Sequence, residues 1–389
     1  MPNPAHEDPH LALREGVRRI CADFPDEYWR VCDAGHEFPW AFYKSVADAG
    51  FVGVAIPEEF GGGGAGITEA SIVLEEIAAS GAAMNGCSAI HLSVFGMNPI
   101  VKHGSDGMKA TYLPRVATGE MHVSFGVTEP DAGTDTTNIS TRATKVDGGY
   151  RVRGRKIWNT KGHIAEKCLL LARTTPLEDV AKRTDGMTLF FIDMQVPAVD
   201  IEPIPKLGRN AVASCEVSFD DAFVADADVV GDVGRGFHHL LDGLNPERIL
   251  LAGEALGIGR AAVRRAVAYA NERVVFGRPI GKNQGISFPL ADAHMRLRAA
   301  EMMIREASAR YDAGLPCGEE ANTAKYLAAD AAYEAADRAV QTHGGMGYAT
   351  EYDVERYWRE ARLIRIAPIS QEMVLNYVAE HVLGLPRSY

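Results

Sequence analysis

Apolar and polar residues alternate with helical spacing along the first part of the chain. The runs WAFYKSVADAG, ITEASIVLEEIAASG and SDGMKATYLPRVATGE are amphipathic, and glycine or proline residues interrupt them where turns are expected. This pattern predicts an N-terminal helical domain over residues 1–120.

The pattern changes between residues 121 and 232. Segments such as HVSFGVTE, GGYRVRGRKIW, KCLLLARTT and GMTLFFIDM alternate or are continuously apolar, and turn residues separate them. Short segments of this kind are typical of strands in a small antiparallel β-domain. Within GRKIWNT, the alternation predicts that Lys156 and Trp158 lie on the same side of a strand.

Helical spacing returns over residues 233–389. Apolar residues in one segment recur at alternating intervals of four and three positions, at Ile286, Leu290, Ala293, Leu297, Ala300 and Ile304. Such spacing predicts the seam of a helical bundle. The next helical segment is rich in alanine, so its neighbours are expected to pack closely against it. The chain is therefore predicted to be an α+β protein, mainly α, with helices, a β-domain and a helical bundle in that order.

The stretch GLNPERILLAGEALG, residues 243–257, resembles a helix N-terminus. Asn245 is suited to the N-cap and Pro246 to the first helical position, where a missing N–H costs nothing. Glu247 would then stand in the first turn of an otherwise apolar helix. Taken alone, it either caps the helix or pairs with Arg248. Glu254, two turns later, is expected to have a structural partner.

Composition narrows the function classes. A net charge of −12 and a pI near 5.5 argue against nucleic-acid binding. No apolar run is long enough to span a membrane, and the acidic N-terminal segment resembles no signal or transit peptide, which favours a bacterial cytoplasm.

The six cysteines lack CxxC spacing, which favours reduced thiols. The segment HEDPH, residues 6–10, has the letters of a zinc motif, but Pro9 disfavours the necessary helix, so no metal site is expected.

Four further segments contain residues suited to ligand binding. VTEPDAGTD, which begins at Val127, is a turn leaving a strand, and KIWNT presents a tryptophan that either packs in a core or walls a flat ligand. RVVFGRPIGKNQ and QTHGGMGY are, taken alone, a basic loop between helices and a helix C-terminus with its glycines. No single segment decides between a structural and a binding role.

Together, and in this order, the segments resemble the acyl-CoA dehydrogenase family over essentially the whole chain. PEEFGGGGAG is similar to the PEEYGG turn of the family, VTEPDAGTD to its TEPxAGSD loop and KIWNT to KxWIT. RVVFGRPIGKNQ resembles RxxFGxxxxxxQ, and QTHGGMGY resembles QxxGGxGY. The resemblance implies an N-terminal helical domain, a middle β-domain and a C-terminal four-helix bundle.

The resemblance also implies FAD as cofactor and an acyl-CoA thioester as substrate, which is oxidised to the trans-2-enoyl-CoA. A carboxylate takes the α-proton and the β-hydrogen leaves as a hydride to flavin N5. FAD would be held partly by a neighbouring subunit of a homotetramer. The implied cofactor-binding residues are Phe125, Val127, Thr128, Gly133, Thr134, Trp158, Thr160, Arg273, Phe276, Gln284, Gln341, Gly345 and Ser370. The implied substrate-binding residues are Thr134 and Arg248.

The chain departs from the family pattern near the flavin. Phe125 stands where a tyrosine is common, Thr134 replaces a serine, and the family's WITN is WNTK here, residues 158–161. Thr160 is retained, but its neighbours differ. The edge of the flavin is therefore expected to be more polar or more exposed than is usual in the family.

The catalytic base is expected at Glu247. Many members carry it late in the chain, where alignment places Pro368, which has no acid–base chemistry. Isovaleryl-CoA and long-chain acyl-CoA dehydrogenases instead place it in an ERxxLA-like helix, which NPERILLA resembles. A helix N-terminus would favour the ionised carboxylate, and desolvation by the acyl chain would raise its pKa again. Pro368 also lacks the N–H that would bind the thioester oxygen, so Ala367 or Ile369 must supply it.

These residues predict an FAD-dependent acyl-CoA dehydrogenase that passes its electrons to an electron-transfer flavoprotein, as in β-oxidation of fatty acids. Cys87, His91 and Phe95, in the segment CSAIHLSVFG, are expected to set the depth of the acyl pocket. Two alternatives remain. The chain could be a degenerate FAD- or acyl-CoA-binding subunit, or an atypical acyl-CoA flavoenzyme such as an oxidase or a desulfinase-like enzyme.

Overall fold

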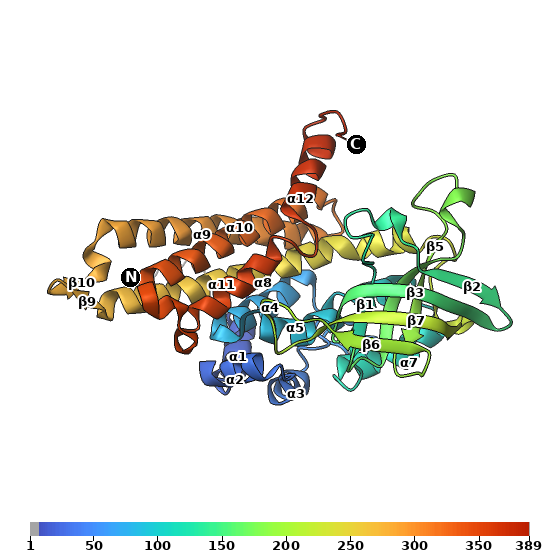
Figure 1. Ribbon diagram of the computed structural model, residues 1–389, viewed down its shortest axis with the longest axis horizontal. Coiled ribbons are helices and arrows are strands. Elements are labelled where there is room, and N and C mark those ends of the chain that lie inside the picture. The colour runs from blue at the N-terminus through green and yellow to red at the C-terminus, as the bar shows by residue number, and fades with distance from the viewer. Residues whose placement is uncertain (1–7, 389) are drawn as a thin grey trace.

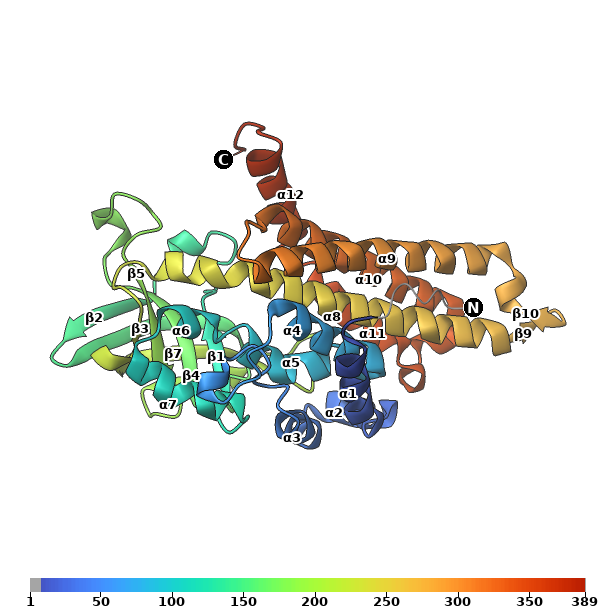
Figure 2. The same ribbon diagram turned by 180° about the vertical axis from the view of Figure 1, so that it is seen from behind.

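The computed structural model describes residues 8–388 and shows an elongated molecule with helices at one end and a β-sheet at the other (Figure 1). Long helices of the C-terminal part lie side by side, and one of them extends from the far end of the molecule to the sheet (Figures 1 and 2). The N-terminal helices pack along one side of these helices and reach the sheet (Figures 1 and 2). The predicted order of helices, β-domain and helices is confirmed.

The N-terminal part is helical, and its central helix is almost entirely buried. α5 has no exposed residue, because it lies between the other N-terminal helices, the first strand and α8. A short kink separates α4 from α5, where Gly81 and Ala83 adopt positive φ angles. The helices are α1 (Leu11–Ala22), α2 (Asp26–Gly35), α3 (Trp40–Asp48), α4 (Ile67–Ile77), α5 (Ala83–Val94), α6 (Asn98–His103) and α7 (Asp106–Ala117).

The sheet has the strand order β6-β7-β3-β2-β4-β5-β8, and β1 pairs with β4. Most neighbours are antiparallel, as predicted, but β1 and β2 both run parallel to β4. Parallel neighbours need a crossover connection, and the β2–β3 hairpin lies between β1 and β4 in the chain. The strands are β1 (Val123–Gly126), β2 (Arg142–Val146), β3 (Gly149–Thr160), β4 (Lys167–Arg173), β5 (Met187–Asp193), β6 (Val199–Pro203), β7 (Ser214–Ala225) and β8 (Val229–Val230).

The prediction that Lys156 and Trp158 share one side of β3 is wrong. Pairing of β3 with β7 is interrupted between Lys156 and Asn159, and Trp158 has a φ angle of 67°. A bulge of this kind changes the side of the sheet to which the following side chains point. Lys156 is therefore fully buried, whereas the Trp158 side chain is 52% exposed.

Helices α8 (Gly236–Glu272), α9 (Gln284–Asp312), α10 (Gly318–His343) and α11 (Val354–Ile364) form the C-terminal helical part. The predicted seam on α9 is confirmed: Ile286 is partly buried, and the other five residues of the seam are buried. The alanine-rich helix is α10, and most of its alanines have no exposed surface, which lets α8 and α9 pack closely on it. Helix α12 (Gln371–Tyr377) projects away from these helices (Figure 1).

Helix α8 begins earlier than the sequence indicates. It starts at Gly236, so Asn245 and Pro246 lie inside the helix rather than at its end. The turns that precede Pro246 bury Leu240 and Gly243, and this packing outweighs the hydrogen bond that a proline cannot donate. Glu247 is consequently not at a helix N-terminus.

The far end of α8 continues into a two-stranded hairpin, β9 (Val274–Val275) and β10 (Arg278–Pro279). This hairpin lies at the end of the molecule opposite the large sheet (Figure 2). No helix within residues 8–388 has both the length and the apolar character needed to cross a bilayer.

Candidate active site

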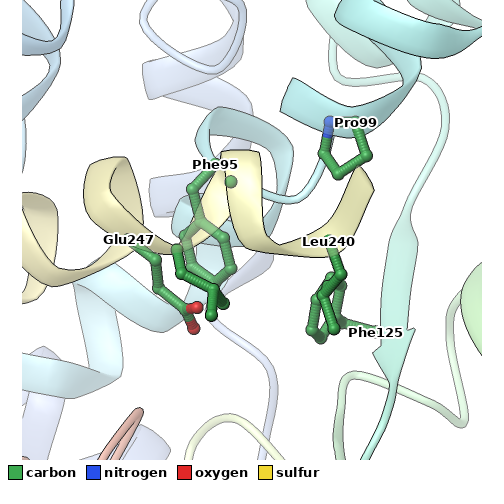
Figure 3. Close-up of a pocket in the computed structure, with 7 residues that line it drawn as sticks. Phe95, Pro99, Phe125, Leu240 and Glu247 are labelled. Carbon is green, nitrogen blue, oxygen red and sulfur yellow. The ribbon is translucent and has the colours of Figure 1, made fainter. Parts of the chain in front are cut away.

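A pocket opens where α5, α6 and α8 meet the first strand. Its volume is about 190 Å³ when the open solvent at its mouth is included, and little of that space is enclosed. Figure 3 shows Glu247 and Phe95 on one side of the pocket and Leu240 and Phe125 on the other. The lining is otherwise apolar, so Glu247 is the only ionisable side chain that it includes. The lining residues are Phe95, Pro99, Phe125, Leu240, Gly243, Leu244 and Glu247.

The carboxyl group of Glu247 is held in an environment that favours its protonated form. Burial raises the pKa of Glu247 to about 7, the positive charge of Arg248 opposes this shift, and Glu254 adds to it. The predicted stabilisation of the ionised carboxylate by a helix N-terminus does not apply, because Glu247 lies inside α8. Desolvation sets the pKa instead, and it places the group where a general base works best at neutral pH.

Arg248 does not line the pocket, and its charge interacts with Cys317 at the start of α10 and with Tyr377 of α12. Its Nη1 donates to Asn245 Oδ1 at 2.9 Å. Lys325 on α10 lies near it, and burial together with Arg248 lowers the pKa of Lys325 to about 8. Lys325 Nζ donates to the carbonyl oxygen of Ile369 at 2.5 Å. Lys325 thus contacts the segment that contains Pro368, and Arg248 lies near Lys325.

The segment 367–370 has few free backbone donors. The Ala367 N–H donates to Leu363 O at 2.9 Å, and Pro368 has no N–H. Ile369 is therefore the remaining candidate of the two predicted donors. The Oγ of Ser370 accepts from Met373 N at 3.3 Å and caps α12.

The loop after β1 is fixed by a buried ion pair that the sequence analysis did not identify. Lys156 Nζ lies 2.8 Å from Glu129 Oε1 and donates to Val127 O at 2.9 Å. Burial lowers the pKa of Lys156 to about 8, and Glu129 partly offsets this. Both residues lie inside segments that resemble motifs of the family. They are 27 residues apart in the chain, and no periodic pattern in the sequence indicates that they meet.

The predicted flavin-loop residues lie along this fixed loop. The carbonyl oxygen of Thr128 accepts from Ile157 N at 2.9 Å, which joins the loop to the strand that carries Trp158. Phe125 lines the pocket, and Gly133 faces open space. Thr134 follows Gly133 in the same turn. The structure thus brings together Phe125, Val127, Thr128, Gly133, Thr134, Trp158 and Thr160.

Thr160 is held by Arg209, a residue to which the sequence analysis assigned no role. Arg209 Nη1 lies 3.3 Å from Thr160 Oγ1 and 3.2 Å from Ser88 Oγ. Burial lowers the pKa of Arg209 to about 10, and Glu254 partly offsets this. Arg209 also has a positive φ of 60°. The buried guanidinium thus links α5 to the end of β3.

The remaining predicted cofactor residues lie elsewhere. Arg273 and Phe276 are at the hairpin, and Gln284 begins α9 beside it. Gln341 and Gly345 stand at the same end of the helices, because His343 stacks on Tyr269 of α8 at 4.3 Å. The hairpin lies at the end of the molecule opposite the large sheet, and Trp158 lies on β3 of that sheet (Figure 2). One chain therefore does not bring these five residues to Trp158.

Known proteins share this whole arrangement. Residues 7–120, 124–222 and 234–383 match the family models for the N-terminal, middle and C-terminal domains of acyl-CoA dehydrogenases. The chain belongs to the acyl-CoA dehydrogenase family. It is 39% identical over 383 residues to acyl-CoA dehydrogenase FadE12 of Mycobacterium tuberculosis, covering 97% of each chain. Mitochondrial isovaleryl-CoA dehydrogenase of Oryza sativa is 31% identical, with 94% of this chain and 89% of the relative covered.

Solved structures agree with these matches. The glutaryl-coenzyme A dehydrogenase glutaryl-CoA complex superposes with a TM-score of 0.93 at 28% identity, covering 99% of this chain and 98% of the other. As a member of the acyl-CoA dehydrogenase family, the chain is an FAD-dependent oxidoreductase. The exposed ring of Trp158 and the open space at Gly133 fit a flat cofactor between the loop and the strand.

The HEDPH segment begins outside the described residues. Its last residue, His10, is described, and its Nδ1 lies 3.6 Å from Glu69 Oε1.

Proposed function

We propose that this acyl-CoA dehydrogenase converts an acyl-CoA thioester to the trans-2-enoyl-CoA and that Glu247 removes the α-proton. The observation that carries the proposal is the position of Glu247: one carboxyl group, with a pKa raised to about 7 by burial, in the wall of an apolar pocket. A base with a pKa near the working pH is the most effective at taking a proton from a weakly acidic carbon.

The pocket residues support this step. Phe95 and Phe125 form apolar walls beside the carboxylate, and an acyl chain between them would exclude the water that remains. Exclusion of water raises the pKa of Glu247 further and strengthens its interaction with the α-proton. When bound, FAD supplies the acceptor for the two electrons that leave with the β-hydrogen.

We infer that Ile369 N–H binds the thioester oxygen. The adjacent Ala367 N–H is used within the chain, and Arg248 and Lys325 give the segment a positive potential. Negative charge that develops on the thioester oxygen during proton removal is stabilised by such a donor and by the two cations.

FAD is proposed to lie between the loop residues of one subunit and the hairpin of another. Phe276 at the tip of the hairpin is fully exposed, and Val274 beside it is 56% exposed. Apolar side chains in such a position are suited to contact a second copy of the chain. This arrangement supports a homotetramer.

We also propose that the reduced enzyme passes its electrons to an electron-transfer flavoprotein.

Anaerobic titration with a panel of acyl-CoAs tests the proposal. We expect loss of the flavin absorbance together with formation of enoyl-CoA. A change in the spectrum without reduction would instead indicate a binding subunit, and rapid reoxidation in air would indicate an oxidase. Glu247→Gln is expected to bind the substrate and to reduce its flavin about 10²–10⁴-fold more slowly. Reduction of this variant at the normal rate would refute the assignment of the base.

A further inference from the structure

The pocket is lined along one face of α8, and this face continues beyond Glu247. Leu240, Gly243, Leu244 and Glu247 follow one another at intervals of three, one and three residues. Residues seven apart lie on nearly the same side of a helix, so Glu254 is the next polar residue on this face. It lies roughly 10 Å further along the helix axis than Glu247.

Helix α5 presents a matching face on the opposite side. Phe95 lines the pocket, and His91, one turn earlier, lies against it with ring centroids 5.4 Å apart. His91 Nδ1 lies 3.0 Å from Glu254 Oε1. The pair therefore closes the space between the two helices directly behind Phe95.

Two buried polar atoms near this pair have no hydrogen-bond partner among the described residues. Glu254 is fully buried, and its Oε2 accepts no hydrogen bond from the described residues. Arg209, whose charge interacts with that of Glu254, is 7% exposed and has a buried Nε–H that is likewise unpaired. An unpaired buried polar atom lowers stability, and a ligand group that forms a hydrogen bond with both atoms would remove this cost.

Helix α8 lies directly against α4 at the level of this pair. Gly253 and Gly257, about two turns of α8 beyond Glu247, lie in close contact with α4. A Cβ at Gly257 would lie 2.3 Å from the carbonyl oxygen of Glu75, and one at Gly253 would lie 2.9 Å from that of Ser71. The two helices are in backbone contact there, so no ligand can pass between α8 and α4.

We propose that His91, Glu254 and Arg209 form a polar end of the acyl pocket and select acyl groups that carry a hydroxyl group at their distal end. A hydroxyl group donates to Glu254 Oε2 and accepts from Arg209 Nε–H. A methyl group would leave both atoms unpaired, and a carboxylate could not donate to Glu254. The ring of Phe95 has to turn aside for the chain to reach the pair. This inference rests on the proposed function, because it assigns the substrate class of the same site.

Binding of two matched series of acyl-CoAs tests the inference. Each chain length is prepared with and without a terminal hydroxyl group, and dissociation constants are measured from the flavin spectrum of the holoenzyme under anaerobic conditions. Glu247→Gln is used as the protein background so that binding is measured without turnover. At one chain length we expect the hydroxylated compound to bind about tenfold or more tightly than its partner.

The matched variants are Glu254→Gln and the double variant His91→Leu with Glu254→Leu, each built in the same background. Replacement of both polar partners by apolar side chains is tolerated better than removal of one. We expect the double variant to keep its FAD and to lose or reverse the preference for the hydroxylated compound. FAD content and melting temperature are measured for every variant.

Three results would overturn the inference, and they differ in whether the proposed function is left standing. Equal binding of both series at every length, with flavin reduction intact in the wild type, would refute the polar selection and leave the proposed function standing. Failure of both series to change the flavin spectrum would refute the proposed function and this inference with it. If the double variant still binds the hydroxylated compounds more tightly, the role of His91 and Glu254 is refuted.

Discussion

Arg209 donates a hydrogen bond from Nη1 to Thr160 Oγ1 over 3.3 Å, and this contact fixes the direction of the threonine hydroxyl group. A guanidinium group has no acceptor, so the oxygen of Thr160 accepts and its O–H remains able to donate elsewhere. We propose, from the family resemblance, that this hydroxyl group points toward the edge of the flavin. The buried arginine would therefore position the donor that the cofactor meets.

Arg209→Met is expected to weaken FAD binding about 3- to 10-fold and to shift the visible absorbance of the bound flavin, because Thr160 loses its fixed orientation. Thr160→Val should give a similar change. Since the two residues act through one contact, the double variant should be no weaker than the more affected single variant. Ser88→Ala, which removes another partner of Arg209, is the control and should have a smaller effect. Additive losses in the double variant would contradict this coupling.

Glu247 should give the reaction a pH dependence near neutrality. Its carboxyl group must be ionised to take a proton, and the pKa of Glu247 is raised to about 7. Flavin reduction at limiting acyl-CoA concentration is therefore expected to rise with pH and to level off above about 7. Stopped-flow absorbance over a pH series measures this dependence. A flat profile between pH 5 and 9 would contradict the role of Glu247.

Lys161 is expected to reduce stability at neutral pH. It is fully buried, its Nζ donates to Ala89 O at 2.8 Å, and burial lowers its pKa from 10.5 to about 7. Below pH 7 both the folded and the unfolded chain carry the proton, so the cost of burying the charge is fully present. Between about 7 and 10.5 only the unfolded chain keeps it, so stability rises with pH in this window.

Lys161→Met should consequently raise the free energy of unfolding by roughly 1–3 kcal/mol at pH 7. The difference between variant and wild type should shrink as the pH rises toward 10. Denaturant unfolding of the FAD-loaded protein at several pH values measures both effects. Lys44→Met, on an exposed side chain, is the control. A constant difference at all pH values would indicate that the charge of Lys161 is not responsible.

Phe276→Ala tests the shared cofactor site. The side chain is fully exposed in the single chain, so the substitution should leave the fold of each subunit unchanged. Loss of an apolar contact to a neighbouring subunit and its FAD should weaken assembly and FAD retention about tenfold. Light scattering and flavin fluorescence measure the two effects. Leu315→Ala, an exposed apolar residue between α9 and α10, is the control. Unchanged assembly and FAD retention would contradict the site between subunits.

Ile369→Pro tests the proposed backbone donor. Removal of the N–H should slow flavin reduction about 10²–10³-fold. Ile369→Ala keeps the N–H and should retain activity close to that of the wild type. FAD content of both variants shows whether the segment is still folded. Normal activity of a folded Ile369→Pro variant would assign the thioester oxygen to another donor.

The sequence by itself determined the order of helices and strands and the seam of α9. Both follow from local periodicity: Leu290, Ala293 and Leu297 recur at helical spacing because one side of the helix is buried. It also determined the family, because several motifs stand in the same order and spacing as in acyl-CoA dehydrogenases. Glu247 was a candidate for the same reason, although its helix was expected to begin beside it.

Only the tertiary structure decided where these residues act. Asn245 and Pro246 have the local properties of a helix start, but the burial of Leu240 against the N-terminal helices extends α8 through them. The bulge in β3 separates Lys156 from Trp158 because pairing with β7, not alternation, sets the side of each residue. His91 and Glu254 are 163 residues apart, and no local pattern records their contact. Such pairs form only when the packing of whole helices brings two side chains together and excludes water from between them.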